Sequence, residues 1–338
     1  MTHKFSIIIP VRKVNDFVKE SISKIKELDY GDYEVLIVLD EKEEGLVDDD
    51  KFKYIFTGSL GPAEKRNIAA KESSGDILAF LDDDAYPRHD WLYIAEREFE
   101  DESVYALAGS TLTPENCSFL EKMAGKVLDT PFVSGSTLLR FRPLERKVID
   151  DSPTVNLFVR KNVFLSIGGF TVNFWPGEDT KLCLDLVNKF KRGFPYEPDL
   201  IVYHHRRELL LPHLKQISRY GRHRGWFARA FPETSRFFPY FIPSLFVLGL
   251  FLGPLVCNFV PYLWNIYFSV ISVYLTVMFF ECVKKASEEK SLLAGCYMSV
   301  GMLLTHVVYG FNFIIGYIKK PELKLRKFDV KTGNYIGG

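Results

Sequence analysis

Three adjacent aspartates, Asp82-Asp83-Asp84, are the residues of this chain with the clearest capacity for chemistry. They follow the apolar run at 77–81, which predicts a buried strand, so the three carboxylates gather at a strand end. Adjacent carboxylates repel one another unless a cation neutralises them, and hard divalent cations prefer oxygen ligands. Such a cation could also stabilise a departing diphosphate. The acidic triplet at 48–50 follows no apolar strand, and we interpret it as solvated surface.

A second acidic group, Glu178-Asp179, follows Gly177 and opens a helix predicted over residues 178–190. Acidic side chains at a helix N-terminus are stabilised by the helix dipole. A carboxylate at the mouth of a site could also take the proton from an acceptor hydroxyl, which makes Asp179 the candidate general base and Glu178 its catalytic neighbour. The same residues could serve only as a helix cap, and the sequence leaves that alternative open.

A pair of histidines, His204-His205, ends a strand predicted at 200–203 and lies within a basic segment. A histidine at a strand end can complete a metal site. Residues 202–236 hold eight Lys or Arg, two Glu and four of the seven histidines. A basic flank beside a membrane segment marks the cytoplasmic side and can hold anionic headgroups. We expect no nucleic-acid partner, because nothing else in the chain indicates a nucleic-acid module.

The elements that must position these residues alternate between strands and helices. Such alternation predicts an α/β fold with a mostly parallel sheet flanked by helices. Ligands of these sheets bind beyond the carboxyl ends of the strands, where Pro10, Asp40 and the three aspartates all fall. Apolar runs predict strands at 5–9, 34–39, 53–57, 77–81, 104–108, 153–160 and 200–203, and periodic patterns predict helices at 13–28, 62–73 and 178–190.

Two long tracts lack Asp, Glu, Lys and Arg: 44 residues at 237–280 and 28 residues at 291–318. Because about 20 apolar residues can cross a bilayer core, these tracts predict membrane helices. We place the helices within 238–258, 262–283 and 292–318.

Charges on either side of the tracts bear on topology. Three crossings would put the basic tail, residues 319–331, outside, which the positive-inside rule disfavours. We therefore expect two crossings and a shallow first segment, which its prolines and glycines permit, with both termini cytoplasmic. The N-terminus shows no signal peptide, and the five cysteines form no disulfide-like framework. Both features favour an integral membrane protein whose catalytic domain is cytoplasmic.

The ordered set of motifs resembles glycosyltransferase family 2, which has the GT-A fold and inverts anomeric configuration. The resemblance covers about residues 4–230 and no Walker or GxGxxG motif competes with it. It rests on Phe5–Pro10, Asp40, Gly61-Pro62, Arg66-Asn67, Asp82-Asp83-Asp84, Gly168-Gly169-Phe170, Gly177-Glu178-Asp179 and His204.

The resemblance implies a role for each motif. The donor would be a nucleotide sugar, UDP- or GDP-linked, bound with a divalent metal, Mn²⁺ or Mg²⁺. The nucleotide base stays open, because the family's Asp-Asp-Gly-Ser is replaced by Asp40-Glu41-Lys42-Glu43. The implied donor-binding residues are Pro10, Asp40, Arg66, Asn67, Asp82, Asp83, Arg222 and Arg224; the metal ligands are Asp82, Asp84 and His204 or His205; the acceptor-binding residues are Trp175 and Gly177; and the base is Asp179.

The expected organisation is a catalytic GT-A domain at 1–230, a membrane region of two to three helices at 237–318 and a basic cytoplasmic tail at 319–338. An interface segment at 204–236 would join the first two. The anchor implies a lipid-linked or glycan acceptor at the cytoplasmic membrane face. Three alternatives stay open: a polyprenyl-phosphate glycosyltransferase, a polysaccharide synthase, and a membrane-tethered nucleotide-sugar binding module without activity.

Overall fold

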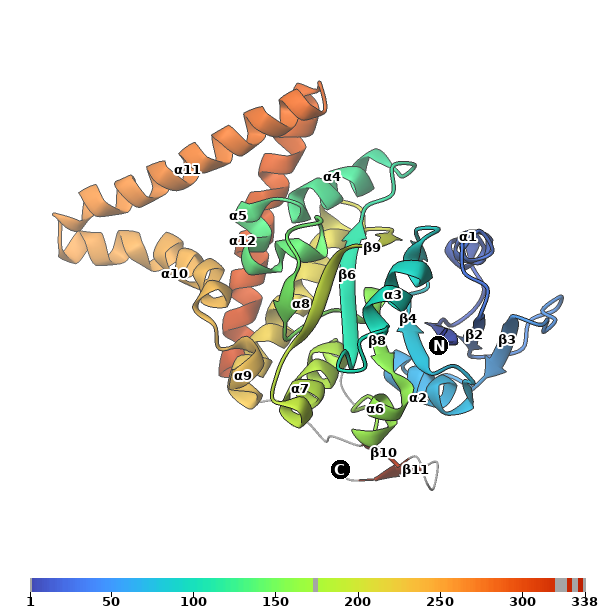
Figure 1. Cartoon of the computed structure of the whole chain (residues 1–338). Coiled ribbons are helices and arrows are strands. Elements are labelled where there is room, and N and C mark those ends of the chain that lie inside the picture. The colour runs from blue at the N-terminus through green and yellow to red at the C-terminus, as the bar shows by residue number, and fades with distance from the viewer. Residues whose placement is uncertain (1, 173–175, 320–326, 330–333, 337–338) are drawn as a thin grey trace. The chain divides into compact units, whose positions relative to one another are not determined.

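A computed structural model describes residues 2–172, 176–319, 327–329 and 334–336. The chain divides into two compact units (Figure 1). The first unit comprises 1–114, 139–205 and 322–338, and the second comprises 115–138 and 206–321. The first unit holds a mixed sheet with helices on both faces, as expected for the α/β class, and the second is helical.

The strands of the first unit are ordered β3-β2-β1-β4-β8-β6-β9-β5, and β7 pairs with β9. The apolar runs of β1, β2 and β4 are buried on both faces, as parallel strands under two helical layers require. The strands are β1 (Phe5–Pro10), β2 (Tyr33–Leu39), β3 (Phe52–Phe56), β4 (Ile77–Phe80), β5 (Ala85–Pro87), β6 (Ala106–Leu112), β7 (Lys147–Ile149), β8 (Leu157–Arg160) and β9 (Phe194–His204).

The expectation of a mostly parallel sheet holds for the first four strands and for the pairing of β6 with β9. β3, β2, β1 and β4 are mutually parallel, but β8 runs antiparallel to both β4 and β6, and β5 and β7 run antiparallel to β9. The short strand β5 has no apolar run, and the first half of β9 contains Pro195 and Pro198, so neither produced a strand pattern in the sequence. The sequence therefore predicted the first four strands, β6, β8 and the end of β9, and it missed β5, β7 and the first half of β9.

The two faces of the sheet form separate cores because successive strand residues point to opposite sides. Ile7 and Ile9 pack with α1 and α3, whereas Ile8 packs with α2, α6 and α7. The helices are α1 (Asp16–Ile25), α2 (Pro62–Glu72), α3 (Trp91–Phe99), α6 (Lys161–Ser166) and α7 (Glu178–Phe190), with 3₁₀ turns η1 (Gly135–Arg140) and η2 (Thr154–Asn156) and a two-stranded sheet of β10 (Lys327–Asp329) and β11 (Asn334–Ile336).

The second unit consists of α4 (Phe119–Leu128), α5 (Pro131–Ser134), α8 (Leu211–Ala230), α9 (Pro232–Ser235), α10 (Phe238–Phe259), α11 (Leu263–Glu288) and α12 (Leu292–Ile318). The last three are long and apolar enough to cross a membrane, with mean hydropathy of 2.0, 1.9 and 1.6. Their bounds lie close to those predicted from the uncharged tracts.

Candidate active site

The site begins at one edge of the sheet. β2, β1 and β4 are adjacent and parallel, with Pro10 paired with Val38 and Ile8 paired with Phe80. Because their carboxyl ends meet at the same edge, Pro10, Asp40 and the three aspartates that follow β4 gather there, as the sequence predicted.

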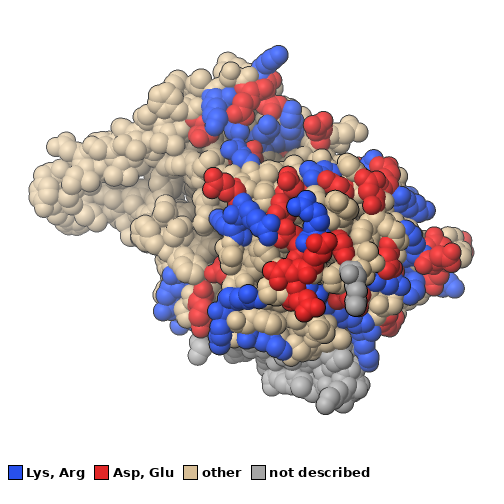
Figure 2. Space-filling view, in the orientation of Figure 1, with Lys and Arg blue, Asp and Glu red and all other residues tan. Residues whose placement is uncertain are grey.

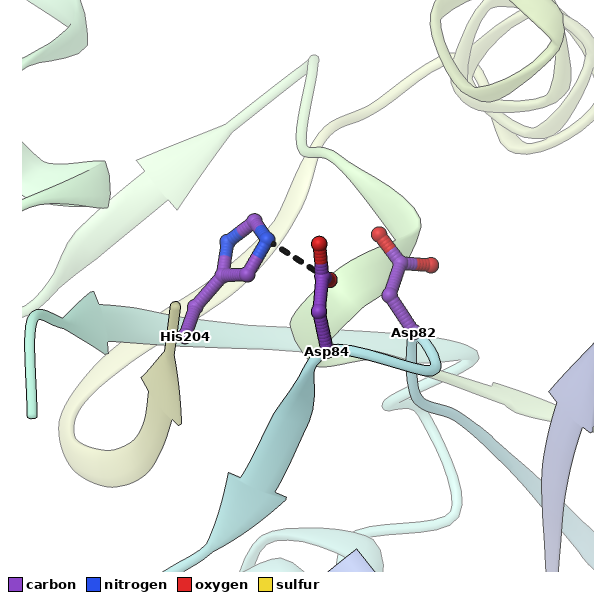
Figure 3. Close-up of side chains that lie close together, drawn as sticks. All are labelled: Asp82, Asp84 and His204. Carbon is purple, nitrogen blue, oxygen red and sulfur yellow. Dashed lines mark ion pairs between the residues drawn. The ribbon is translucent and has the colours of Figure 1, made fainter. Parts of the chain in front are cut away.

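Two of the three aspartates meet His204 at this edge. One ligand atom each from Asp82, Asp84 and His204 lies within 4.8 Å of the others, and His204 Nε2 is 3.1 Å from Asp84 Oδ1 (Figure 3). The pairing of β5 with β9 sets Ala85 opposite His204 and so brings the histidine beside the loop after β4. Asp83 is half-buried between its neighbours and is not part of this group.

The three side chains fit a divalent cation. Protein ligands lie about 2.0–2.6 Å from such an ion, so ligand atoms that share it are separated by at most about 5 Å. Two carboxylate oxygens and an imidazole nitrogen suit Mn²⁺ better than an ion that takes only oxygen ligands, such as Ca²⁺. Asp84 is buried, and a buried carboxylate requires a cationic partner. By contrast, residues 48–50 are exposed, as expected for a solvated triplet.

His205 lies elsewhere. Its Nε2 is 2.9 Å from Glu20 Oε2, and its ring packs on Phe17 with centroids 4.6 Å apart. Its backbone N–H donates to the Asp84 carbonyl oxygen at 2.9 Å. Adjacent residues at a strand end point to opposite sides, so only one of the two histidines can face the aspartates. The structure brings His204 to them and turns His205 toward α1.

Arg66 connects the metal-ligand group to the start of α7. Its side chain is 4% exposed, and its guanidinium donates to Asp82 Oδ1 at 2.6 Å and to Glu178 Oε1 at 3.4 Å. It also lies over the Phe170 ring at 5.6 Å. Arg66 therefore holds two carboxylates from different elements in one arrangement, in addition to the donor-binding role that the resemblance implied.

The start of α7 holds the two acidic residues. Gly177 adopts φ +125°, a conformation that favours glycine, and its N–H donates to Glu178 Oε2 at 3.0 Å. Burial, together with the neighbouring Asp179 carboxylate, raises the pKa of Glu178 from 4.5 to about 7. Asp179 is half-buried, and its Oδ1 accepts a hydrogen bond from the Thr180 N–H at 2.7 Å. Of the two, Asp179 is the more accessible to a substrate.

Asn67 holds a neighbouring loop. Its Nδ2 donates to the Phe170 carbonyl at 2.9 Å, and its Oδ1 accepts from the Phe170 N–H at 2.8 Å. This two-bond clamp fixes the backbone after Gly168-Gly169. The loop leads toward residues 173–175, so Trp175, the predicted acceptor contact, lies outside the described residues.

The sequence analysis missed Lys65. This buried lysine forms an ion pair with Asp40 and donates to the Val11 carbonyl at 2.5 Å. A lysine in the first turn of α2 gave no signal of its own, because only the fold brings it beneath the ends of β1 and β2. Lys65 and any nucleotide base bound here would therefore both contact the Asp40 carboxylate.

The two arginines of the predicted donor set belong to the second unit. Arg222 donates to Asn312 Oδ1 at 3.3 Å, and Arg224 donates to Ser235 Oγ at 3.1 Å and lies over the Tyr240 ring at 4.8 Å. Both are therefore engaged with the helices of their own unit.

Residues 6–164 match the family model described as "Glycosyl transferase family 2". A pre-mycofactocin glycosyltransferase from Mycobacterium tuberculosis is 26% identical over 229 residues, covering 64% of this chain and 46% of that protein. Glycosyltransferase AglE from Haloferax volcanii is 28% identical, covering 52% of this chain and 58% of that protein. The chain thus spans about half the length of the curated relatives that it matches.

A solved structure shares the fold. Mannosyltransferase PcManGT from Pyrobaculum calidifontis, determined in complex with GDP-Man and Mn²⁺, superposes with a TM-score of 0.54 at 16% identity. The match covers 94% of this chain and 88% of that one, so it includes the helical unit as well as the sheet.

Proposed function

This chain belongs to glycosyl transferase family 2, and we propose that it transfers a sugar from a nucleotide-diphosphate donor to a hydroxyl acceptor with inversion of the anomeric carbon. The observation that carries the proposal is the convergence of Asp82, Asp84 and His204 at the carboxyl edge of the sheet. That edge is where ligands of α/β sheets bind, and a diphosphate needs cationic neutralisation there.

Asp82, Asp84 and His204 would hold a divalent cation, for which Mn²⁺ suits the mixed oxygen and nitrogen ligands. When bound, the cation offsets negative charge on the diphosphate. The relative solved with GDP-Man and Mn²⁺ supports this donor class, either GDP- or UDP-linked. Asp40, which Lys65 holds at the end of β2, and the backbone at Pro10 would contact the nucleotide base.

The chemical step is a single displacement. Asp179 takes the proton from the acceptor hydroxyl, and the oxygen forms a bond to the anomeric carbon. The bond from that carbon to the phosphate oxygen breaks, and the nucleoside diphosphate leaves with the electron pair. Arg66 keeps Asp82 and Glu178 in place, so the cation ligands and the start of α7 keep a constant spacing.

The acceptor is proposed to be a lipid-linked glycan at the cytoplasmic membrane face. The three apolar helices support this proposal, because they would keep the enzyme at a bilayer. A polyprenyl phosphate acceptor is the alternative, and it needs no general base. Asp179→Asn should lower turnover by about 10²–10⁴ on a hydroxyl acceptor, whereas a phosphate acceptor would leave turnover nearly unchanged.

The test is a donor screen on the purified full chain with Mn²⁺, in which released nucleoside diphosphate is measured. We expect release from one class of donor, its loss in chelator and in Asp84→Ala, and a strong decrease in His204→Ala. His205→Ala is the matched control, because that neighbouring side chain pairs with Glu20, and it should retain Mn²⁺ activation. Donor turnover that survives both chelator and Asp84→Ala would overturn the metal assignment. An absence of turnover with every donor would favour the binding-module alternative.

A further inference from the structure

The three apolar helices of the second unit differ in how the protein covers them. α12 has eleven buried residues, whereas α10 has three and α11 has two. Large apolar side chains are exposed along much of α10 and α11, among them Phe251, Phe259, Val273 and Phe279. The high hydropathy that the three helices share therefore hides two different environments.

Helices α4, α5 and α8 each cover a part of α12, and α10 and α11 also contact it. Near its start, Met298 and Met302 pack in one cluster with Met123 and Val127 of α4. Its middle contacts α5, where the His306 ring nitrogen Nε2 is 3.1 Å from the Phe132 carbonyl oxygen.

The second half of α12 runs beside α8. His213 Nε2 is 2.9 Å from Thr305 Oγ1, and Arg229 donates to the Tyr317 carbonyl at 3.0 Å. Between these contacts the backbones approach so closely that a Cβ at Gly225 would overlap the Phe313 carbonyl. The two helices are therefore packed in parallel over about four turns.

This packing opposes insertion of α12 across a bilayer. α8 carries five Lys or Arg side chains, and two of them, Arg222 and Arg229, bond directly to α12. A crossing α12 would take α8 with it, at a cost of about 2.5–3.5 kcal/mol for each charge near the bilayer centre.

The exposed side chains of α12 follow a single stripe. Leu293, Val300, Phe311 and Ile318 are exposed and are spaced by seven, eleven and seven residues. At 3.6 residues per turn these spacings return to the same face. Most of the rest of α12 is covered by protein, so this single stripe is the face that α12 leaves for lipid, as in a helix that lies along a membrane surface.

α10 and α11 have the features of crossing helices. They meet at the turn 260–262, away from α12, and the surface over them in Figure 2 shows no charged side chain near that turn. α10 has 22 residues, or about 33 Å of helix, which exceeds the roughly 30 Å bilayer core. Tyr262 and Trp264 lie at this turn, next to Asn265. Tyr and Trp side chains are enriched at membrane interfaces.

The end of α11 is held by α4. Glu289, just after α11, forms ion pairs with Lys122 and Lys126 of α4. Only six residues, 113–118, separate α4 from β6. Even fully extended they reach about 22 Å, which is less than the bilayer core. A linker this short cannot cross the bilayer, so α4 and the end of α11 stay on the membrane face from which the chain enters α4, here called the near face.

We propose that α10 and α11 are the two membrane crossings of this chain, that the turn 260–262 reaches the far face, and that α12 stays on the near face as a surface helix. This assignment keeps the expected even number of crossings. It differs from the sequence-based one, which made the first helix shallow and the third a crossing. The partner surface is a lipid bilayer around α10 and α11.

The test is cysteine labelling of the full chain in sealed cells with a membrane-impermeant maleimide. Single cysteines are placed in a chain whose five native cysteines are replaced: Tyr262→Cys at the turn, Lys290→Cys between α11 and α12, and Lys319→Cys after α12. We expect Tyr262→Cys to be labelled from outside, and the other two only after the membrane is permeabilised. Membrane retention of each variant is the folding control, and the readout is independent of catalysis.

Three results would overturn the proposal. Labelling of Lys319→Cys from outside would show that α12 crosses the bilayer. Labelling of Tyr262→Cys only after permeabilisation would show that the α10–α11 hairpin is shallow, and Asn258→Cys serves as a second reporter of the same turn. Labelling of Lys290→Cys from outside would place the end of α11 on the far face and contradict the ion pairs with α4.

Discussion

Removal of the Arg66 side chain should destabilise the first unit mainly through Glu178. Arg66 pairs with Asp82 at 2.6 Å and with Glu178 at 3.4 Å, but the two carboxylates differ in access to water. Asp82 is 30% exposed and can be rehydrated, whereas Glu178 is 7% exposed and cannot. Breaking a buried pair by removing one partner costs about 3–5 kcal/mol. For Arg66→Ala we expect a loss of about 3 kcal/mol in the free energy of unfolding, the lower end of this range, because water can solvate the Asp82 carboxylate in place of Arg66.

The pH dependence identifies the responsible carboxylate. In the wild type, burial and Asp179 raise the pKa of Glu178 to about 7, so ionisation of Glu178 lowers stability as the pH rises from 4.5 through 7. Loss of the Arg66 charge raises that pKa further. At pH 6 Glu178 in the variant then keeps its proton and needs no cationic partner. The loss in free energy of unfolding caused by Arg66→Ala should therefore be smaller at pH 6 than at pH 8.

The assay is thermal unfolding of the purified chain in detergent at one fixed scan rate, because chains with more than one compact unit often unfold irreversibly. A deficit of about 3 kcal/mol corresponds to a decrease of roughly 6–12 °C in the midpoint for a domain of this size. Adding Glu178→Gln to Arg66→Ala should restore most of the decrease, and adding Asp82→Asn should restore less. Equal midpoints for Arg66→Ala and the Glu178 double variant, or a deficit that does not change with pH, would refute the reasoning.

Two further predictions concern the sheet. Burial raises the pKa of Glu34, but hydrogen bonds from Lys53, Ser74 and Ser6 together outweigh burial and lower the pKa to about 2. The ionised carboxylate therefore stabilises the fold above pH 4.5, and this contribution is lost as the pH falls toward 2. Glu34→Gln should therefore lower the unfolding midpoint at pH 7, with a difference from wild type that shrinks in acid; an equal difference at pH 7 and pH 3 would contradict this. A Cβ at Gly109 would overlap the Leu200 carbonyl of β9, so Gly109→Ala should cost about 1–3 kcal/mol in the same thermal assay, whereas the control Gly31→Ala, with open space around it, should not.

The positions of the chemical groups along the chain could be predicted from the sequence because they depend on local patterns. Apolar, β-branched runs give buried strands, and ligands bind where parallel strands end. This reasoning found Asp40, the aspartates at 82–84 and the acidic start of α7. It also separated them from the solvated triplet at 48–50, which is exposed. The length of each uncharged tract similarly predicted the three helices to within a few residues.

Contacts between residues distant in the sequence could be decided only by the tertiary structure. The antiparallel strand β5 sets the side chain of His204, and not that of His205, beside the Asp84 side chain, although the sequence shows two adjacent residues of the same type. Arg66 meets Glu178 across 112 positions of the chain, and no local pattern reports such a pair. The burial of α12 by α4, α5 and α8 also could not be predicted from the sequence. Hydropathy depends only on the residues within a helix, whereas its surroundings, whether protein, solvent or lipid, depend on tertiary packing.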